Sequence, residues 1–501
     1  MDGSVSTSKI ACSVGRWLID NGLAKLFALA RPLLLYDDGN ASWMDAWDMS
    51  DWRIRRDAPT SRRIHKCGNP LVVEVSEPTD EALLDGLQRA AFGYFLKAVN
   101  PANGLIADNS RPNSPVSIAV VGFALSSYVV AVERGWLARA DGVERSLAAL
   151  RFFRDSDQSG SPEATGYKGF YYHFLDLHTG ARVWRSELSM IDTALLIAGA
   201  LTASMYFDGN IPDEIELREL VDMLFRRIDW RWAQDGGATL RQGWKPECGF
   251  LHYGWEGYNE AIVLYVLALG SPTHPLKGDG YHAWTATYQW ENLYGHDFLY
   301  GGPLFVHQYS HAWIDFRGIR DRFMREKRCD YFENSRRATL VQREYAQRNP
   351  SEFAGYDEHC WGLTACDGPS DELPDVTGEA RRFFGYAARG VPYGPDDGTV
   401  AGWASLASLP FAPEIALDAA RNMHRRYPEM LSESRYASGF NPSLATADHR
   451  AWVSRGHFGL DQGILVMMIE NHCSGLIWRL MRACPYMRAG LRHAGFRGGW
   501  L

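Results

Sequence analysis

The chain has 501 residues, of which 46% are hydrophobic, 13% aromatic and 22% charged, and its net charge at pH 7 is −8. This is the composition of a soluble globular protein, long enough for several domains or for one large toroidal domain. No long basic run points to nucleic acid as a partner. No stretch reaches the roughly 18 consecutive apolar residues that would cross a membrane.

Residues 1–75 show no clear period and are predicted to form an N-terminal extension, followed by one domain over residues 76–501. The apolar stretch Leu23–Tyr36 is interrupted by Lys25 and Arg31, so it makes a poor export signal. We expect a cytoplasmic protein as the chain stands, or a periplasmic one if the natural start differs. The eight cysteines form no CxxC pair and are expected to be free thiols.

From Thr79 onward, two kinds of helix alternate. Amphipathic helices with one solvent-facing side are predicted at 80–98, 141–155, 211–228, 329–348 and 412–427. Helices that are apolar on every face, and therefore buried, are predicted at 115–134, 189–207, 257–269, 303–313, 398–408 and 461–471. One amphipathic partner is missing between 270 and 302, where Ala283–Trp290 is the only candidate.

Six buried helices that alternate with about six outer ones predict an all-α fold, an (α/α)6 barrel of two concentric rings. A helical solenoid would show a repeated sequence period, and the chain shows none. Links from a buried helix to the next outer one are mostly short. The long links all lead into buried helices: 99–114, 156–188, 229–256, 349–397 and 428–460. In alternating rings these links gather at one end, where a site is expected.

A small β-hairpin is predicted in the second of these links. The aromatic, alternating segment from Phe170 to Phe174 precedes a turn at His178–Gly180, and the chain returns through Val183 and Trp184. The hairpin leads into an acidic link and then a buried helix. We therefore expect carboxylates to be held where an aromatic loop meets a helix N-terminus, a position that favours negative groups.

Acidic residues stand before or at the start of four buried helices. They are Glu187 and Asp192, then Glu247, Glu256 and Glu260, then Asp396 and Asp397, and finally Asp461. Each has a structural alternative. Ser189 and Asp192 fit a capping box about as well as a catalytic role. Asp461 and Asp397 fit plain N-caps, which for Asp397 is the better interpretation. Glu256 and Glu260 fit one solvated face, although the apolar run that follows argues against it.

Taken together, several unpaired acids at one end of the rings would converge on one pocket and raise each other's pKa. Glycoside hydrolysis needs one protonated carboxyl as acid and one ionised carboxylate as base or nucleophile. The aromatic surroundings favour Glu260 or Glu256 as the acid. The helix N-terminus favours Asp192 as the base, with Glu187 as the alternative.

Aromatic and polar residues in the same loops are candidates for substrate binding, because aromatic rings stack on the apolar faces of sugars, although core packing will account for at least half of them. The candidates are Tyr172, Trp184, Trp244, Trp255, Tyr258, Glu358, His359, Trp361 and Asp397. For His252, His307 and His311 no carboxylate–histidine spacing suggests a metal site, so structural roles are expected.

Seven ordered motifs, among them SELSMIDTALLIAGAL, GWKPECGFLHYGWEGYNEA and HFGLDQGILVMMIENH, resemble the glucoamylase-like family. That family includes the β-1,2-glucanases of glycoside hydrolase family 144 and the transglycosylating part of cyclic β-1,2-glucan synthases. The resemblance covers about Thr79 to Leu501. It implies an (α/α)6-barrel catalytic domain that hydrolyses β-glucan, most often β-1,2-linked, without a metal. Carried over motif by motif, it implies catalytic candidates at Glu187, Asp192, Glu256, Glu260 and Asp461.

Other functions remain open at this point. A glucan transglycosylase would share the fold, and a non-catalytic glycan-binding protein would need the aromatic residues but not the acids. A phosphorylase would need a phosphate-binding cluster, and a polysaccharide lyase would need a basic cleft, which the acid-rich loops argue against. We expect an oligo- or polysaccharide as the partner, no cofactor, and a monomer.

Overall fold

The computed structural model describes residues 78–501, so the predicted extension over residues 1–75 lies outside the described residues. The buried helices are confirmed where the apolar run is long. Nearly every residue is buried in α3 (Ile118–Glu133), α5 (Met190–Tyr206), α7 (Ile262–Gly270) and α14 (Gly459–Cys473). Their side chains belong to one hydrophobic core. In the described part of the chain, no helix combines the length and the apolar character needed to cross a membrane.

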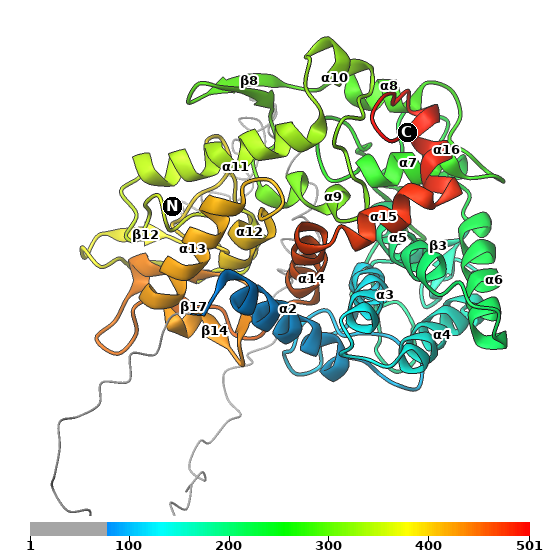
Figure 1. Cartoon of the computed structure of the whole chain (residues 1–501), viewed down its shortest axis with the longest axis horizontal. Helices are drawn as coiled ribbons and strands as arrows, with labels where there is room; N and C mark the ends of the chain where they lie inside the picture. The colour runs from blue at the N-terminus through cyan, green and yellow to red at the C-terminus, as the bar shows by residue number, and fades with distance from the viewer. Residues whose placement is uncertain (1–77) are drawn as a thin grey trace, which may run out of the picture.

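The amphipathic helices are also confirmed. They are α2 (Asp80–Lys97), α4 (Arg139–Asp155), α6 (Pro212–Arg227), α11 (Tyr331–Arg348) and α13 (Pro413–Arg426). α6 shows the local signals well, because Pro212 occupies its first turn together with Asp213 and Arg227 closes its last turn. Figure 1 shows α3, α5, α9, α12 and α14 toward the middle of the molecule, with α2, α4, α6, α11 and α13 around them.

Two central helices approach each other through glycine. A Cβ added to Gly199 on α5 would lie 1.9 Å from the carbonyl oxygen of Gly122 on α3, and one added to Gly122 would lie 2.3 Å from the carbonyl oxygen of Leu195. No side chain fits into either space, so both positions require glycine. The backbones of α3 and α5 are thus in direct contact.

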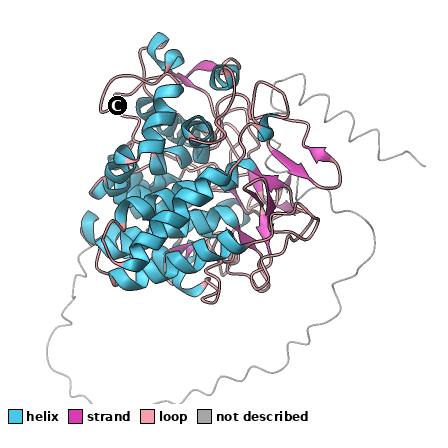
Figure 2. Cartoon of the chain, turned by 90° about the vertical axis from the view of Figure 1, so that its right-hand side faces the viewer, coloured by secondary structure: helices cyan, strands magenta, loops and turns pink. Residues whose placement is uncertain are grey.

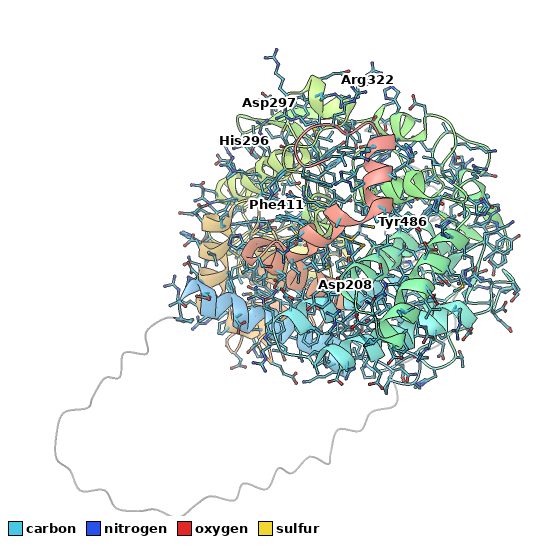
Figure 3. All side chains as sticks on the ribbon, turned by 45° about the vertical axis from the view of Figure 1, so that its right-hand side comes forward. Asp208, His296, Asp297, Arg322, Phe411 and Tyr486 are labelled. Atoms are coloured by element: carbon cyan, nitrogen blue, oxygen red, sulfur yellow. The ribbon has the colours of Figure 1, made fainter. Side chains whose placement is uncertain are left out.

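The region between 270 and 302 contains one short helix, α8 (Gly280–Thr285), which begins before the predicted candidate at Ala283 and ends at Thr285. Trp290, the last residue of the candidate, begins β8. Two helices after α14, α15 (Leu476–Ala483) and α16 (Pro485–His493), had no predicted bounds, and α16 packs against α7. Figure 3 labels Tyr486 on α16. The ring of this residue lies 4.7 Å from that of Phe225 on α6. α7 therefore packs against a helix from a distant part of the chain.

Three predicted buried helices are shorter than expected. The segment 303–313 divides into a 3₁₀ turn (Leu304–His307) and α9 (Tyr309–Trp313). α12 covers only Gly402–Ala407, because Val400 pairs with Phe440 in a β-bridge. α7 begins five residues later than predicted, which leaves Gly257–Ala261 as a non-helical approach to it. One further short helix is α10 (Arg322–Glu326).

The predicted hairpin is only part of a larger arrangement. A bridge between Leu175 and Arg182 retains the expected turn. However, the preceding aromatic strand pairs elsewhere, in a five-stranded antiparallel sheet of order β2-β3-β5-β6-β7. Its strands are β2 (Gly166–Tyr167), β3 (Phe170–Tyr172), β5 (Leu188–Ser189), β6 (Gly243–Lys245) and β7 (Gly249–Phe250). Two long links thus form one sheet that fixes the approaches to α5 and α7.

Other long links form two-stranded sheets, and Figure 2 shows most strands gathered on one side of the helices. The pairs are β1 (Val116–Ser117) with β4 (Phe174–Leu175), β8 (Trp290–Leu293) with β9 (His296–Leu299), β10 (Ala365–Cys366) with β13 (Ala387–Ala388), β11 (Glu372–Pro374) with β12 (Ala380–Arg382), β14 (Leu431–Ser432) with β15 (Arg435–Tyr436), and β16 (Phe440–Asn441) with β17 (Trp452–Val453). The protein is therefore helix-rich, with short strands in its long links.

Candidate active site

Three of the predicted acids meet around Tyr309, at the start of α9. Burial raises the pKa of the Tyr309 phenol, and the charges of Asp461, Glu260 and Asp192 raise it further. These acids come from three separate segments, which the fold brings to one region. Asp192, Glu260 and Asp461 thus lie within electrostatic range of one side chain.

Glu187 and Asp192 flank a histidine that the sequence analysis did not single out. Nδ1 of His173 lies 3.0 Å from Oε1 of Glu187, and its Nε2 lies 3.6 Å from Oδ2 of Asp192. Burial alone would raise the pKa of Glu187, but the hydrogen bond and the charge of His173 outweigh burial and lower it. Glu187 is therefore held as a carboxylate.

The capping interpretation of Asp192 is also correct. Ser189 is the N-cap of α5, and its Oγ accepts a hydrogen bond of 3.2 Å from the backbone N–H of Asp192. The same hydroxyl donates to the carboxylate of Asp192. The cap thus fixes the direction of this carboxylate, so the structural role and an active-site position coexist in one residue.

Glu260 has surroundings that differ from those of Glu187. Its side chain is 3% exposed, and Oε2 has no hydrogen-bond partner among the described residues. Burial raises its pKa to about 8, with a further contribution from the charge of Asp192. Its backbone carbonyl accepts a hydrogen bond of 2.7 Å from Ser310 Oγ, which fixes the non-helical segment before α7. At neutral pH this carboxyl carries its proton.

Glu256 lies on the same segment but lines more open space. It borders the small cavity of about 70 Å³ that contains Glu260 and also a separate cavity of about 470 Å³ formed with Arg241, His252 and Thr287. Its side chain is half-buried, unlike that of Glu260. The two glutamates are therefore not equivalent, although the sequence could not separate them.

Asp461 is not the N-cap that one interpretation suggested. The N-cap of α14 is Phe458, and Asp461 lies in the first turn of the helix. Its side chain is 5% exposed, and Oδ2 has no hydrogen-bond partner among the described residues. Burial raises its pKa well above the ordinary value, and the charges of Asp108 and Asp367 add to this effect.

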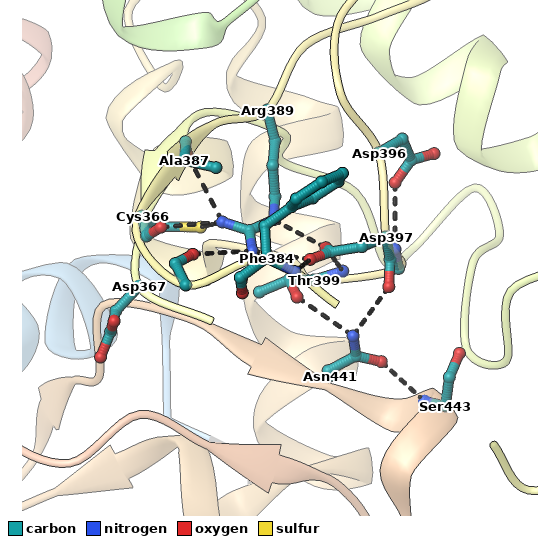
Figure 4. A network of polar contacts seen from close by, with 12 residues as sticks. Cys366, Asp367, Phe384, Ala387, Arg389, Asp396, Asp397, Thr399, Asn441 and Ser443 are labelled. Atoms are coloured by element: carbon teal, nitrogen blue, oxygen red, sulfur yellow. Dashed lines mark hydrogen bonds and ion pairs between the residues drawn. The ribbon is translucent and has the colours of Figure 1, made fainter. Parts of the chain in front are cut away.

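Asp397 is neither an N-cap nor a sugar contact. α12 begins only at Gly402, and the carboxylate of Asp397 is engaged by Arg389 at 2.7 and 2.8 Å (Figure 4). Both side chains are completely buried, at 0% exposed. Glu247 likewise pairs with Arg182, at 2.7 Å. These acids stabilise the loops.

The predicted aromatic residues fall into exposed and buried groups. Trp184 is 57% exposed, and its ring lies 5.1 Å from that of Phe174, next to His173. Trp244 is half-buried and stacks on Tyr167 at 5.3 Å. Tyr172 and Trp361 are fully buried, which argues against the prediction that they contact sugar. Trp255 and Tyr258 are at most 7% exposed, but both line the small cavity that contains Glu260.

Glu358 and His359 contact outer helices. His359 Nδ1 pairs with Asp418 on α13, and Arg343 on α11 donates to the carbonyl of Glu358 at 3.2 Å. Of the histidines with expected structural roles, His307 contacts the carbonyl of Gly301 at 2.8 Å. Within residues 78–501, no group of three acidic, histidine or cysteine side chains could hold a metal ion.

Two polar residues near the candidate acids were not named from the sequence. One is His173, which directly follows the aromatic strand β3. Asp108 lies in the long link 99–114, for which no residue was named. Burial raises the pKa of Asp108, and it lies close enough to His173 and Asp192 for their charges to act on it. Both residues are polar and lie in long links that lead into buried helices, and this position could have identified them as candidates.

The family model described as "Putative glucoamylase" matches residues 252–485. A "putative glucoamylase" structure from Bacteroides uniformis is 30% identical, with a TM-score of 0.74 over 85% of this chain and 99% of that chain. An endo-beta-1,2-glucanase from Chitinophaga pinensis, in complex with sophorotriose and glucose, is 26% identical, with a TM-score of 0.71 over 85% of this chain and 100% of that chain. An exo beta-1,2-glucooligosaccharide sophorohydrolase (non-reducing end) from Parabacteroides distasonis is 27% identical. The match covers 83% of this chain but only 58% of the length of that protein.

Proposed function

Because the chain belongs to the glucoamylase-like family, we propose that it is a glycoside hydrolase that cleaves β-1,2-glucan. The relative from Parabacteroides distasonis is named for β-1,2-glucooligosaccharides, and the similar structure from Chitinophaga pinensis is named for β-1,2-glucan. A neutral glucan also suits a site rich in carboxyl groups, which would repel an anionic chain.

The observation that carries the proposal is the contrast between Glu260 and Glu187. Glu260 is buried without a partner for Oε2 and keeps its proton near neutral pH, whereas His173 holds Glu187 ionised. Glycoside hydrolysis needs one carboxyl in each state. In the proposed reaction Glu260 gives its proton to the leaving glycosidic oxygen. Asp192 or Glu187 then takes the proton of the attacking water or attacks the sugar carbon itself.

The finer fold assignment forms part of the proposal. We infer that the helices over residues 76–501 form a single catalytic domain arranged as an (α/α)6 barrel, with α16 as the outer partner of α7. The contact between α7 and α16 supports this arrangement, and so does the gathering of the short strands on one side of the helices. Asp461 contributes a further buried carboxyl near Tyr309, and Trp184 has an exposed ring that could stack on a sugar.

The purified protein should be incubated with linear β-1,2-glucan and, in parallel, with starch, laminarin and carboxymethyl cellulose. The products should be separated by chromatography. We expect sugars from β-1,2-glucan alone, as a ladder if cleavage is internal or as one short product if it starts from a chain end. Products of higher mass than the substrate would indicate a transglycosylase. Binding without any product would indicate a glycan-binding protein.

The activity is expected to fall as the pH rises through about 8. Glu260 must be protonated to act as the acid, and burial together with the charge of Asp192 places its pKa at about 8. Above that pH, kcat/KM on β-1,2-glucan should decrease about tenfold per pH unit, because this ratio reports ionisations of the free enzyme. The measurement is kcat/KM between about pH 4 and 10. A profile that stays flat to pH 10 would remove Glu260 from the role of acid.

A further inference from the structure

His173 lies between two of the candidate catalytic carboxylates, with one ring nitrogen facing each. Nδ1 is 3.0 Å from Oε1 of Glu187, and Nε2 is 3.6 Å from Oδ2 of Asp192. A neutral imidazole has only one N–H and could donate to only one of them, while the other nitrogen would direct a lone pair at a carboxylate. A doubly protonated ring would donate a hydrogen bond to Glu187 and present its second N–H to Asp192 at ion-pair distance.

The ring is held in this position by its neighbours. It stacks on Phe174 with 3.9 Å between the ring centroids and an angle of 14° between the planes. Its backbone N–H donates to the carbonyl of Glu187 at 2.9 Å, and its carbonyl accepts from Ile118 at the start of α3. The backbone contacts fix the position of the histidine between β3, the approach to α5 and the start of α3, and the stack on Phe174 restrains the plane of its ring.

The charges around the ring favour a cation. Burial alone would lower the pKa of His173, but the charges of Asp192, Glu187 and Asp108 outweigh burial and raise it to about 9. The carboxyl groups that raise the pKa of His173 thus come from three segments of the chain. Lys245 and Arg111 act on two of these carboxyl groups, Lys245 on Glu187 from β6 and Arg111 on Asp108 from the first long link.

We propose that His173 is a positioning residue that carries a positive charge, holds Glu187 ionised and clamps the carboxylates of Glu187 and Asp192 in the geometry that catalysis requires. This proposal rests on the hydrolytic function proposed above and adds a residue to it. A cation between two carboxylates offsets their mutual repulsion, so that both can occupy one region. Asp192 in turn raises the pKa of Glu260, which helps Glu260 to retain the proton that it must donate.

The first test is His173→Gln, with His178→Gln as the matched control, because His178 is exposed on the turn of the same segment. We expect His173→Gln to lower kcat far more than it changes KM. The acidic limb of the pH profile should move up by about one to three pH units, since an opposite charge at this distance lowers a carboxyl pKa by that amount. His173→Lys restores a positive charge at this position, so the acidic limb of its pH profile should lie closer to that of the wild type. A folded His173→Gln variant with an unshifted limb would refute the proposal.

The second test does not depend on activity. The histidine ring signals of the wild-type protein are followed by NMR from about pH 5 to 10, and the His173 signal is identified by its absence in His173→Gln. We expect a midpoint near 9, and a lower one in Asp192→Asn. A midpoint near the ordinary value of about 6.5 would overturn the proposal even if glucan is cleaved. A midpoint near 9 in a protein that cleaves no glucan would support the cationic clamp and reject the proposed function alone.

Discussion

Replacement of Glu260 by glutamine is expected to reduce kcat on β-1,2-glucan by about 10²- to 10⁴-fold, the usual contribution of a general acid. Glutamine has nearly the size of the protonated carboxyl but cannot give a proton to the leaving oxygen. KM should change little, because the side chain is buried and lines only a small cavity. The measurement is the initial rate of reducing-sugar release at pH 6 to 7, with circular dichroism to verify folding.

Glu256→Gln is the matched comparison, since Glu256 lies four residues earlier on the same segment and borders the same cavity. We expect it to retain most of the activity. The opposite pattern, with activity lost in Glu256→Gln and kept in Glu260→Gln, would exchange the two roles. Equal losses in both variants would indicate that the segment before α7 has been disturbed, which circular dichroism and thermal unfolding would detect.

Asp397→Ala is expected to lower the free energy of unfolding by about 3 to 5 kcal/mol, because it removes one partner of a buried ion pair. Arg389 would stay buried without its counter-charge. Its guanidinium also donates to the carbonyls of Cys366, Phe384 and Gly385, so it is tied in place (Figure 4). Urea denaturation followed by tryptophan fluorescence measures the effect.

The control is Glu326→Ala, which breaks an ion pair with Arg322 on α10 in which both side chains are more than 60% exposed. Its denaturation midpoint should hardly move, because exposed pairs contribute little. At a temperature where Asp397→Ala remains folded, its KM should equal that of the wild type. A stable Asp397→Ala variant with a raised KM would instead return Asp397 to the list of sugar contacts.

The helices were predictable to the extent that they depend on local pattern. The interval 80–98 corresponds to α2 and 211–228 to α6, each within a residue, because one continuous period and ordinary end signals specify them. The segment before α7 was predicted as the first turn of a helix, yet it forms bends and turns, and the hydrogen bond from Ser310 to Glu260 holds it in that conformation. The partner of α7 depends on packing between distant segments, which no local pattern contains.

The site was predictable as a set of acids but not as a set of roles. The gathering of long links at one end placed Glu187, Asp192, Glu260 and Asp461 together. Which glutamate of the segment before α7 is buried depends on the neighbouring loops, so Glu256 and Glu260 could not be separated. Asp397 looked available because its partner, Arg389, is an arginine in a loop with no recognisable pairing pattern. The roles of these acids depend on their burial and on their ion-pair partners, and residue type alone does not reveal either.

The contact between α7 and α16 has a consequence for folding kinetics. α7 ends at Gly270 and α16 begins at Pro485, so a growing chain completes α7 long before its partner is synthesised. The two helices pack very closely. A Cβ added to Gly490 on α16 would lie only 1.9 Å from the carbonyl oxygen of Val266 on α7. Contacts so distant in sequence form slowly and leave apolar surface exposed meanwhile. The segment carrying Glu260 therefore gains its full support only in a late step of folding.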